Sequence, residues 1–504
     1  MKPQNDSLTI NWIQKWANYS PKAIALVDEE AGLSMSYSEL AKVVAFYAIK
    51  LKSYGLQKGD RLAILSPNKI EFIYLFLASQ QLGIILVPLN FRLTPSEISG
   101  LIHDCEPSIW VLDSVFEEYV IDAEFTGKVI LFHELSLWTK EALEQSKIKE
   151  TEIEGDFTSV CMILYTSGTT GKPKGAQITN SMLFWNSVNT GLRLNLTQDD
   201  CSFIHAPFFH TGGWNVLTTP LFHRGAKLIF VSKFNADKLL ERCEKYKATI
   251  IWGVPTMMDM LSKSEKFEKS DLSSIRYAVV GGEPMPIRLI EIWQEKGVPI
   301  RQGYGLTEFG PNVFSLNEED AIRKRGSIGF PNFYIDTKVM KENGVECKAN
   351  EDGELWLSGP VCTPGYWNNP QATEDAIELG WFKTGDIVRF DDEGYFYVVD
   401  RKKDLFISGG ENVYPAEIER VIHQMPQVHE VAVIGVADEI WGEVGKAFIV
   451  FDSRKAESLS QEEVLIHCRH HLAKYKVPKY VEFIAELPKT DSGKILKRKL
   501  KHKQ

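Results

Sequence analysis

The sequence has no apolar stretch long enough to cross a bilayer and no apolar leader at its N-terminus. Its first twenty residues are largely polar, unlike the hydrophobic core of a signal peptide. The most apolar region, residues 73–89, is interrupted by polar side chains, Gly83 and Pro88, so it falls short of the ~20 apolar residues of a membrane span. We interpret residues 70–83 as a buried helix and residues 84–89 as a buried strand, and we expect a cytoplasmic protein.

Cysteine pairs and excess basic charge are also missing. The seven cysteines include no C-x-x-C pair, which argues against a disulfide framework and a zinc knuckle and favours a reducing compartment. The 57 Lys and Arg residues stand against 67 Asp and Glu, for a formal net charge of −10. That balance argues against a nucleic-acid protein whose affinity rests on a basic surface. We therefore expect no nucleic-acid partner.

What the sequence does contain is the pattern of a large α/β protein. Its 504 residues, 44% hydrophobic and 25% charged, suffice for about three folded units. Short apolar runs alternate with helical patterns, and this alternation predicts parallel sheets covered on both faces. The runs that indicate a first sheet are residues 62–65, 84–87 and 108–112, and those that indicate a second are residues 227–231, 249–252 and 277–280.

The C-terminal part has a different pattern of predicted elements. From about residue 326 to residue 400 the pattern changes to short strands and turns, and the charged run Asp400–Asp404 follows. We predict an α/β fold with a large N-terminal domain, residues 1–400, made of two doubly wound sheets plus a small β-rich subdomain. A smaller, mobile α+β C-terminal domain is expected over residues 401–504.

The loop at residues 165–175, YTSGTTGKPKG, is rich in groups that can bind phosphate. It holds three glycines, four Ser or Thr hydroxyls and two lysines directly after the apolar run 160–164. Such a loop can aim backbone N–H groups, hydroxyls and ammonium charges at a polyphosphate. A flexible Ser/Gly linker is the alternative, but a linker would not normally carry Lys-Pro-Lys beside a buried strand. The loop is not a Walker A motif, because no Gly-Lys in the chain precedes Ser or Thr.

This string resembles the signature of the adenylate-forming superfamily, which includes acyl-CoA synthetases, peptide-synthetase adenylation domains and beetle luciferases. Five further motifs follow in the family's order, and the resemblance covers essentially the whole chain. They are QGYGLTE at residues 302–308, WFKTGD at 381–386, DRKKD at 400–404, SGGEN at 408–412 and PKTDSGK at 488–494.

The resemblance implies an enzyme that uses ATP and Mg²⁺ to form an acyl-adenylate and then an acyl-CoA. A carboxylate attacking the α-phosphate of ATP is repelled unless cations and donors neutralise the two anions. Glu308 matches the Mg²⁺ ligand, a hard oxygen donor, and Lys494 matches the residue that bridges the carboxylate and the α-phosphate. The implied catalytic residues are Lys494, Glu308, Thr166 and Lys174.

The nucleotide-binding residues are implied by the same motifs. Tyr304 and the glycine pair 281–282 would flank the adenine, and Asp386 would accept hydrogen bonds from the ribose hydroxyls. Read alone, the glycine pair and Asp386 would be ordinary turn residues and Glu308 a surface glutamate. The implied set is Thr166, Ser167, Gly168, Thr169, Thr170, Gly171, Lys174, Gly281, Gly282, Glu283, Gly303, Tyr304, Gly305, Thr307, Asp386 and Arg401.

The C-terminal motifs imply a division of labour between two half-reactions. In the family the C-terminal domain rotates, withdraws the lysine loop and presents a glycine loop to the pantetheine tunnel. Asp400 matches the hinge of that rotation, and Gly409 and Gly410 match the CoA loop.

The acyl substrate is indicated by residues 206–214, APFFHTGGW. This run resembles the family segment that borders the carboxylate site, and it implies acyl contacts at Phe209, His210 and Trp214. In long-chain fatty acyl-CoA synthetases a tryptophan at the place of Trp214 gates an apolar acyl tunnel, a role that aromatic side chains suit. The alternatives are that Trp214 and Phe209 belong to the core and that His210 is a hydrogen-bonded histidine beside the site.

The predicted function is therefore that of an AMP-forming acid–thiol ligase for a medium- or long-chain fatty acid. Three alternatives stay open: an aromatic acid–CoA ligase, an adenylate ligase that loads a carrier protein, and a nucleotide-binding relative without catalysis. The expected partners are ATP, CoA and a small carboxylic acid. A fatty substrate leaves peripheral contact with a bilayer open.

Three further features have plain structural interpretations. Asn180 stands where many family members have a histidine, so a substrate contact there is in doubt. We interpret the basic segment 494–503, apart from Lys494, as a solvated helix end. His467 and His471 are four residues apart on a predicted helix, and without a carboxylate in the run we expect a solvated face and no metal site.

Overall fold

The computed structural model divides the chain into two compact units. The first unit comprises Met1–Arg325, Gly329–Asp336 and Ser358–Phe382, and the second comprises Gly326–Ile328, Thr337–Leu357 and Lys383–Gln504. The residues described are 10–148, 152–166, 173–282, 285–401, 404–408, 411–438, 441–451, 459–472, 474–489 and 495–501.

One sheet of the first unit has the strand order β6-β5-β3-β4-β7-β8. All neighbouring pairs are parallel except β7 and β8, which form an antiparallel pair. Its strands are almost continuous apolar runs because helices cover both faces. The bounds are β3 Arg61–Leu65, β4 Ile85–Leu89, β5 Ile109–Leu112, β6 Lys128–Leu131, β7 Val160–Thr166 and β8 Lys174–Thr179.

The remaining strands of the first unit form a second layer of sheet. One part has the order β2-β1-β10-β9, and the other runs β11-β12-β13-β14 and on to β15. The bounds are β1 Ile24–Asp28, β2 Leu33–Ser36, β9 Cys201–Ile204, β10 Lys227–Phe230, β11 Ile250–Gly253, β12 Tyr277–Val280, β13 Ile300–Tyr304, β14 Phe314–Ser315 and β15 Ser327–Pro331. The first strands of the chain thus lie beside strands some 200 residues later, since Leu26 is in register with Leu228.

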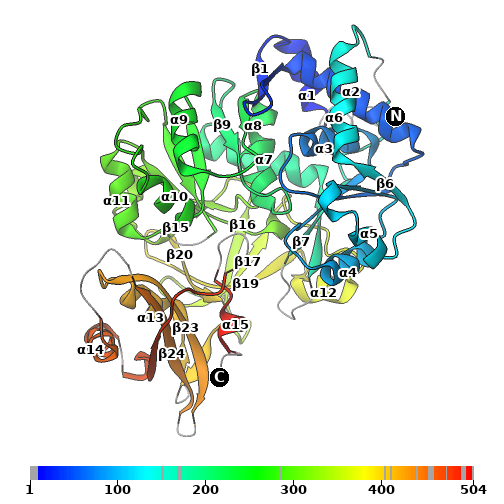
Figure 1. The fold of residues 1–504 in the computed structure, drawn as a ribbon. Coiled ribbons are helices and arrows are strands. Elements are labelled where there is room, and N and C mark those ends of the chain that lie inside the picture. The colour runs from blue at the N-terminus through cyan, green and yellow to red at the C-terminus, as the bar shows by residue number, and fades with distance from the viewer. Residues whose placement is uncertain are drawn as a thin grey trace. The chain divides into compact units, whose positions relative to one another are not determined.

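Successive side chains of a strand point to opposite faces of its sheet and so belong to different hydrophobic cores. These cores separate the layers of the first unit. Ile64 and Leu228 belong to one core between the two layers of sheet, whereas Ala63 packs toward α4 and Ile229 toward α9. Figure 1 shows α4 and α5 on one side of this unit and α9, α10 and α11 on the other. The helices are α1 Trp12–Tyr19, α2 Tyr37–Ser53, α3 Glu71–Leu82, α4 Pro95–Cys105, α5 Tyr119–Asp122, α6 Phe132–Glu144, α7 Asn180–Leu194, α8 Thr218–Arg224, α9 Ala236–Tyr246, α10 Pro255–Ser262, α11 Ile287–Glu295 and α12 Pro370–Ala376.

The second unit combines two sheets with three helices among its described residues. Strands β20, β19, β17 and β16 are neighbours in that order, and a separate sheet has the order β22-β21-β24-β23, with β25 paired to β24. Helices α13 and α14 share a core with this separate sheet (Figure 1). The bounds are β16 Asp336–Met340, β17 Gly353–Ser358, β18 Ile377–Glu378 (paired with β19 in the first unit), β19 Trp381–Phe390, β20 Phe396–Arg401, β21 Phe406–Ser408, β22 Glu411–Val413, β23 Val428–Asp438, β24 Gly442–Phe451, β25 Tyr480–Phe483, α13 Pro415–Ile422, α14 Gln461–His471 and α15 Lys497–Lys501.

The architecture confirms the predicted α/β class with two doubly wound layers of sheet. The helix and strand expected over residues 70–89 are α3 and β4. The runs 62–65, 84–87 and 108–112 lie together in one sheet as β3, β4 and β5, whereas β1 and β2, which were not predicted, pair beside β10. Among the described residues, no helix is both long and apolar enough to cross a membrane; the cytoplasmic location stays a prediction, as does the domain division at residue 400.

Candidate active site

The base of the proposed phosphate loop is a β-hairpin in the first unit. Strand β7 ends at Thr166, β8 begins at Lys174, and these two residues are directly paired across the antiparallel ladder. The loop is therefore fixed at both ends to the carboxyl edge of a parallel sheet, where α/β proteins bind their ligands. Ser167, Gly168, Thr169, Thr170 and Gly171 lie outside the described residues.

Glu308 lies opposite this hairpin in a short 3-10 turn, Thr307–Phe309. The turn is anchored by the ring of Phe309, which is fully buried. The hydroxyl of Thr166 lies 3.4 Å from Glu308 Oε1 and equally far from the carbonyl oxygen of Lys174. Glu308 thus lies beside the Thr166–Lys174 hairpin base, although it is 142 positions from Thr166 in the sequence.

A third segment completes this cluster, and the sequence analysis missed it. The hydroxyl of Tyr366 donates to Glu308 Oε1 at 3.0 Å, and the backbone N–H of Thr363 donates to Glu308 O at 2.8 Å. The Lys174 ammonium lies 5.1 Å from the centre of the Tyr366 ring. The available signal was an aromatic pair, Tyr366 and Trp367, after Pro-Gly, but nothing local connects that pair with Glu308.

The cluster fits a hard divalent cation. Glu308 supplies a carboxylate, and Thr166 places a hydroxyl oxygen beside it, the kind of oxygen donors that Mg²⁺ prefers. Among the described residues, no group of three or more His, Cys, Asp or Glu side chains forms a dedicated metal cage. One protein carboxylate is nonetheless in keeping with Mg²⁺ that arrives with nucleotide phosphates and keeps several waters.

The residues expected around the adenine lie at the ends of two neighbouring parallel strands. Gly281 and Gly282 follow β12, and Gly303 and Tyr304 end β13. The Tyr304 ring packs edge-on against Phe314, with centroids 5.8 Å apart. At Gly305 a Cβ would lie 1.6 Å from the Pro311 carbonyl oxygen, so only glycine fits there. Glu283 lies outside the described residues.

The ribose candidates lie in the second unit. Asp386 on β19 is directly paired with Arg401 on β20, and Asp386 is 2% exposed. The ladder thus brings together two residues that were predicted from separate motifs. The expected hinge residue, Asp400, is also buried and accepts a hydrogen bond from the backbone N–H of Ala416 at 2.9 Å. Gly409, Gly410 and Lys494 lie outside the described residues.

The basic C-terminal segment departs from the solvated helix that was expected. Lys497 forms a 2.8 Å ion pair with Glu419 of α13, and their side chains are 16% and 19% exposed. Leu500 is fully buried. The expectation is wrong at these residues because α15 packs on the rest of the second unit and buries one of its own faces.

The acyl candidates lie in one compact turn. Trp214 is 1% exposed and donates from Nε1 to the Phe208 carbonyl oxygen at 2.6 Å. The Phe209 ring lies 4.5 Å from the His210 ring, and the turn is tied to the loop after β3, since Asn68 donates to Ala206 O at 2.7 Å. Asn68 carries no motif, so the sequence did not indicate it.

An apolar pocket borders this turn. It is lined by Trp12, Phe76, Leu77, Gln80, Trp214, Thr218, Thr219 and Phe222. The space is small, about 10 Å³, which is room for about one water molecule. Trp214 therefore packs as a core residue here, and its contact with an acyl chain stays a prediction.

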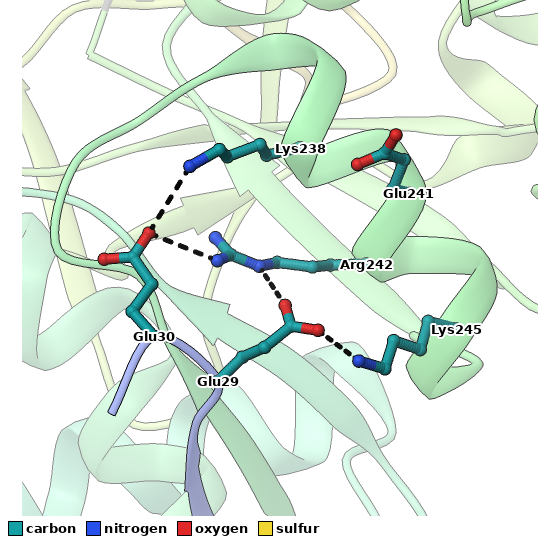
Figure 2. Close-up of a pocket in the computed structure, with 6 residues that line it drawn as sticks. All are labelled: Glu29, Glu30, Lys238, Glu241, Arg242 and Lys245. Carbon is teal, nitrogen blue, oxygen red and sulfur yellow. Dashed lines mark hydrogen bonds and ion pairs between the residues drawn. The ribbon is translucent and has the colours of Figure 1, made fainter. Parts of the chain in front are cut away.

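A second pocket in the first unit is lined only by charged side chains (Figure 2). Arg242 of α9 donates to Glu29 at 2.7 Å and to Glu30 at 3.3 Å, and Lys245 also pairs with Glu29. Three acidic and three basic residues line the pocket, so their formal charges cancel. We interpret it as an ion-pair network that fastens α9 to the turn after β1, and not as the reaction site.

Two minor expectations can be placed in the structure. Asn180 is buried and donates to Asp156 O at 2.8 Å while accepting from Gln80 at 2.9 Å, so its amide is engaged within the fold. His467 lies 3.1 Å from the Val421 carbonyl oxygen, which makes it a packing residue between α14 and α13.

Comparison with known proteins gives a consistent result over the whole chain. The family described as AMP-binding enzyme matches residues 13–367, and the family described as AMP-binding enzyme C-terminal domain matches residues 417–494. A feruloyl-CoA synthase from an Amycolatopsis species is 37% identical over 493 residues, 98% of each chain. The long-chain-fatty-acid–CoA ligase FadD13 of Mycobacterium tuberculosis is 36% identical over 503 residues, again 98% of each.

A solved structure is similar over the same extent. The o-succinylbenzoate coenzyme A synthetase MenE of Bacillus subtilis, in complex with ATP and magnesium ion, superposes with a TM-score of 0.87 at 33% identity, covering 97% of this chain and 99% of that one.

Proposed function

Because this chain belongs to the family of AMP-binding enzymes, we propose that it makes the CoA thioester of an apolar carboxylic acid, foremost a medium- or long-chain fatty acid. The reaction class is acid–thiol ligation with formation of AMP, and the enzyme uses ATP, Mg²⁺ and CoA. The observation that carries the choice of acid is the aromatic turn 206–214: Phe209 lies against His210, Trp214 borders a small apolar cavity, and aromatic side chains suit an apolar chain.

In the proposed first half-reaction, a carboxylate oxygen of the acid attacks the α-phosphorus of ATP and pyrophosphate leaves. Lys494 would neutralise the charge that the two anions share, and Lys174 and the hydroxyls at the end of β7 would hold the phosphates. Glu308, with Thr166 beside it, would hold Mg²⁺ on the phosphates. The bound ion supplies charge neutralisation on the phosphate oxygens.

The nucleotide's other parts would be held by strand ends. Gly281, Gly282 and Gly303 would let the adenine lie beside backbone, with Tyr304 against its face, and Gly305 would let the following turn pack on Pro311. The paired strands β19 and β20 would present Asp386 and Arg401 to the ribose and phosphate.

In the proposed second half-reaction, the CoA thiol attacks the acyl carbon and AMP leaves. A C-terminal domain, residues 401–504, would rotate about Asp400 between the steps, so that the loop with Gly409 and Gly410 replaces the Lys494 loop at the site.

An aromatic acid is the second candidate substrate. It is favoured by the 37% identity to a feruloyl-CoA synthase and by the likeness to an o-succinylbenzoate coenzyme A synthetase. The aromatic side chains of the turn 206–214 suit a phenyl ring as well as an alkyl chain.

The experiment that separates the two is a substrate panel. Pyrophosphate release and acyl-CoA formation are measured with ATP and Mg²⁺ for acetate, C6 to C18 fatty acids, benzoate, ferulate and 2-succinylbenzoate, with and without CoA. A maximum of kcat/KM among the C6 to C18 acids, with turnover that needs CoA, supports the proposal. A maximum at ferulate or 2-succinylbenzoate overturns it in favour of the aromatic acid.

A further inference from the structure

The segment Thr363–Trp367 holds both the backbone and the side chain of Glu308. Thr363 N donates to Glu308 O at 2.8 Å, and Tyr366 Oη donates to Glu308 Oε1 at 3.0 Å. Two hydrogen bonds from one short segment thus determine where this carboxylate lies and how it is turned. In the described part of the chain, no hydrogen bond reaches the other carboxylate oxygen, Oε2.

The segment can do this because it is itself fixed on the hairpin of the phosphate loop. It pairs with β8: Gln177 N donates to Gly365 O at 3.1 Å and Trp367 N donates to Gly175 O at 2.7 Å. Gly365 has φ +138°, and a Cβ there would lie 2.4 Å from Thr373 Cγ2, so the turn that aims Tyr366 requires glycine.

The ring and the hydroxyl of Tyr366 face different partners. The ring lies under the Lys174 ammonium at 5.1 Å, a cation–π distance, whereas the hydroxyl meets Glu308. A tyrosine hydroxyl carries its proton at physiological pH, so it can donate this hydrogen bond.

We propose that Tyr366 is a positioning residue for the magnesium ligand: its hydroxyl occupies Oε1 of Glu308 and leaves Oε2 for the cation. The inference rests on the proposed role of Glu308 in holding Mg²⁺. Partners that orient a metal ligand typically change metal affinity or activity by about 10–100-fold when they are removed. Tyr366 would then tune the Mg²⁺ requirement of the enzyme without touching substrate.

The variant Tyr366→Phe tests this, because it removes the hydroxyl and keeps the ring beside Lys174. Binding of α,β-methylene-ATP to the full chain is measured by calorimetry, first in EDTA and then over a MgCl₂ titration. We expect the Mg²⁺ concentration for half-maximal enhancement of binding to rise by about 10-fold or more, with binding in EDTA unchanged. In turnover assays, kcat/KM at limiting Mg²⁺ should fall and should recover at high Mg²⁺.

Two variants make the outcome decisive. Tyr37→Phe is the matched control, because it also removes a buried hydroxyl, one that donates to Ala226 O at 2.7 Å, and it should leave the Mg²⁺ titration unchanged. Glu308→Gln should shift the Mg²⁺ titration at least as far as Tyr366→Phe. If Glu308→Gln shifts it and Tyr366→Phe does not, the role of Tyr366 is refuted while that of Glu308 stands.

The remaining outcomes are equally informative. If neither variant shifts the Mg²⁺ titration, the proposed role of Glu308 itself fails. If Tyr366→Phe weakens binding equally in EDTA and in MgCl₂, its hydroxyl supports the site as a whole, and the specific link to the cation is wrong.

Discussion

At the scale of single residues, His205 is a buried histidine whose protonation opposes folding. Its ring lies 5.3 Å from the Trp252 ring and 6.1 Å from the Phe234 ring, and burial lowers its pKa to about 4. Because an unfolded histidine titrates near 6.5, the unfolded state binds more protons than the folded state between pH 6.5 and pH 4. Stability therefore falls as the pH drops through this window.

We predict that the titration of His205 lowers the free energy of unfolding by about 2 kcal/mol when the pH is lowered from 7 to 5. Urea unfolding of wild type and His205→Gln at both pH values measures this, and the variant should lose less stability than wild type. His103→Gln, an exposed histidine on α4, serves as the control and should follow wild type. Equal losses for wild type and His205→Gln would show that burial does not lower the pKa of His205 in the folded state.

Single residues could be predicted from the sequence where they stand in a motif. They could not be predicted where their role depends on a contact with a residue far away in the sequence. Glu308 stands in a motif, and the structure places it beside Thr166 at 3.4 Å. Tyr366 meets the same carboxylate across 58 positions of sequence, a separation that no local pattern encodes. Lys497 looked like a solvated charge because a run of lysines does not reveal that Glu419 lies within 2.8 Å.

At the scale of elements, periodicity predicted individual strands but not their neighbours. The apolar run 62–65 is β3 and the run 227–231 contains β10, as expected. The placement of β1 beside β10 depends on parallel pairing over about 200 residues. The sequence of a short apolar strand does not indicate which of two sheets it joins. The order of the strands in each sheet therefore came from the structure.

The contact between α9 and the turn after β1 gives a test of such long-range pairing. Arg242 is 6% exposed in its side chain and pairs with Glu29 and Glu30 (Figure 2). We predict that Arg242→Met destabilises the protein by on the order of 2–3 kcal/mol, because it removes a buried guanidinium and leaves the half-buried Glu29 and the exposed Glu30 with weaker partners. The urea midpoint of the first unfolding transition measures the loss.

The matched control is Lys245→Met, which removes the exposed partner of Glu29 from the same helix. Surface ion pairs contribute little, so this variant should unfold close to wild type. The side-chain hydrogen bonds of Lys245 and Arg242 lower the pKa of Glu29, and the stability that they give is lost as the pH falls below the usual glutamate range. A loss for Lys245→Met as large as that for Arg242→Met would mean that burial of the guanidinium does not matter.

At the scale of the whole molecule, the proposed residues divide between the two units. Thr166, Lys174, Glu308 and Tyr366 form one cluster in the first unit, whereas Asp386, Asp400 and Lys494 belong to the second. The motif order in the sequence predicted these residues apart from Tyr366, but it carries no information on how the two units are arranged.

The alternation predicts opposite defects for two substitutions in the second unit. Lys494→Ala should reduce adenylate formation by about 10²–10³-fold, the scale of a lost electrostatic contact in the transition state. It should leave thioester formation from supplied acyl-adenylate and CoA near wild type, because the proposed rotation would withdraw the lysine loop from that step. A bulky side chain at Gly410 should spare adenylate formation and block the thioester step, since it would fill the path of the pantetheine arm.

Both half-reactions are measured separately, as pyrophosphate release without CoA and as acyl-CoA formation from synthetic adenylate. Thermal unfolding of each variant checks that the second unit is intact. Equal loss of both half-reactions in both variants would contradict alternation, because it would mean that Lys494 and Gly410 serve one fixed arrangement of the two units. Opposite losses would assign each loop to one half-reaction, which is the behaviour expected of a domain that presents them in turn.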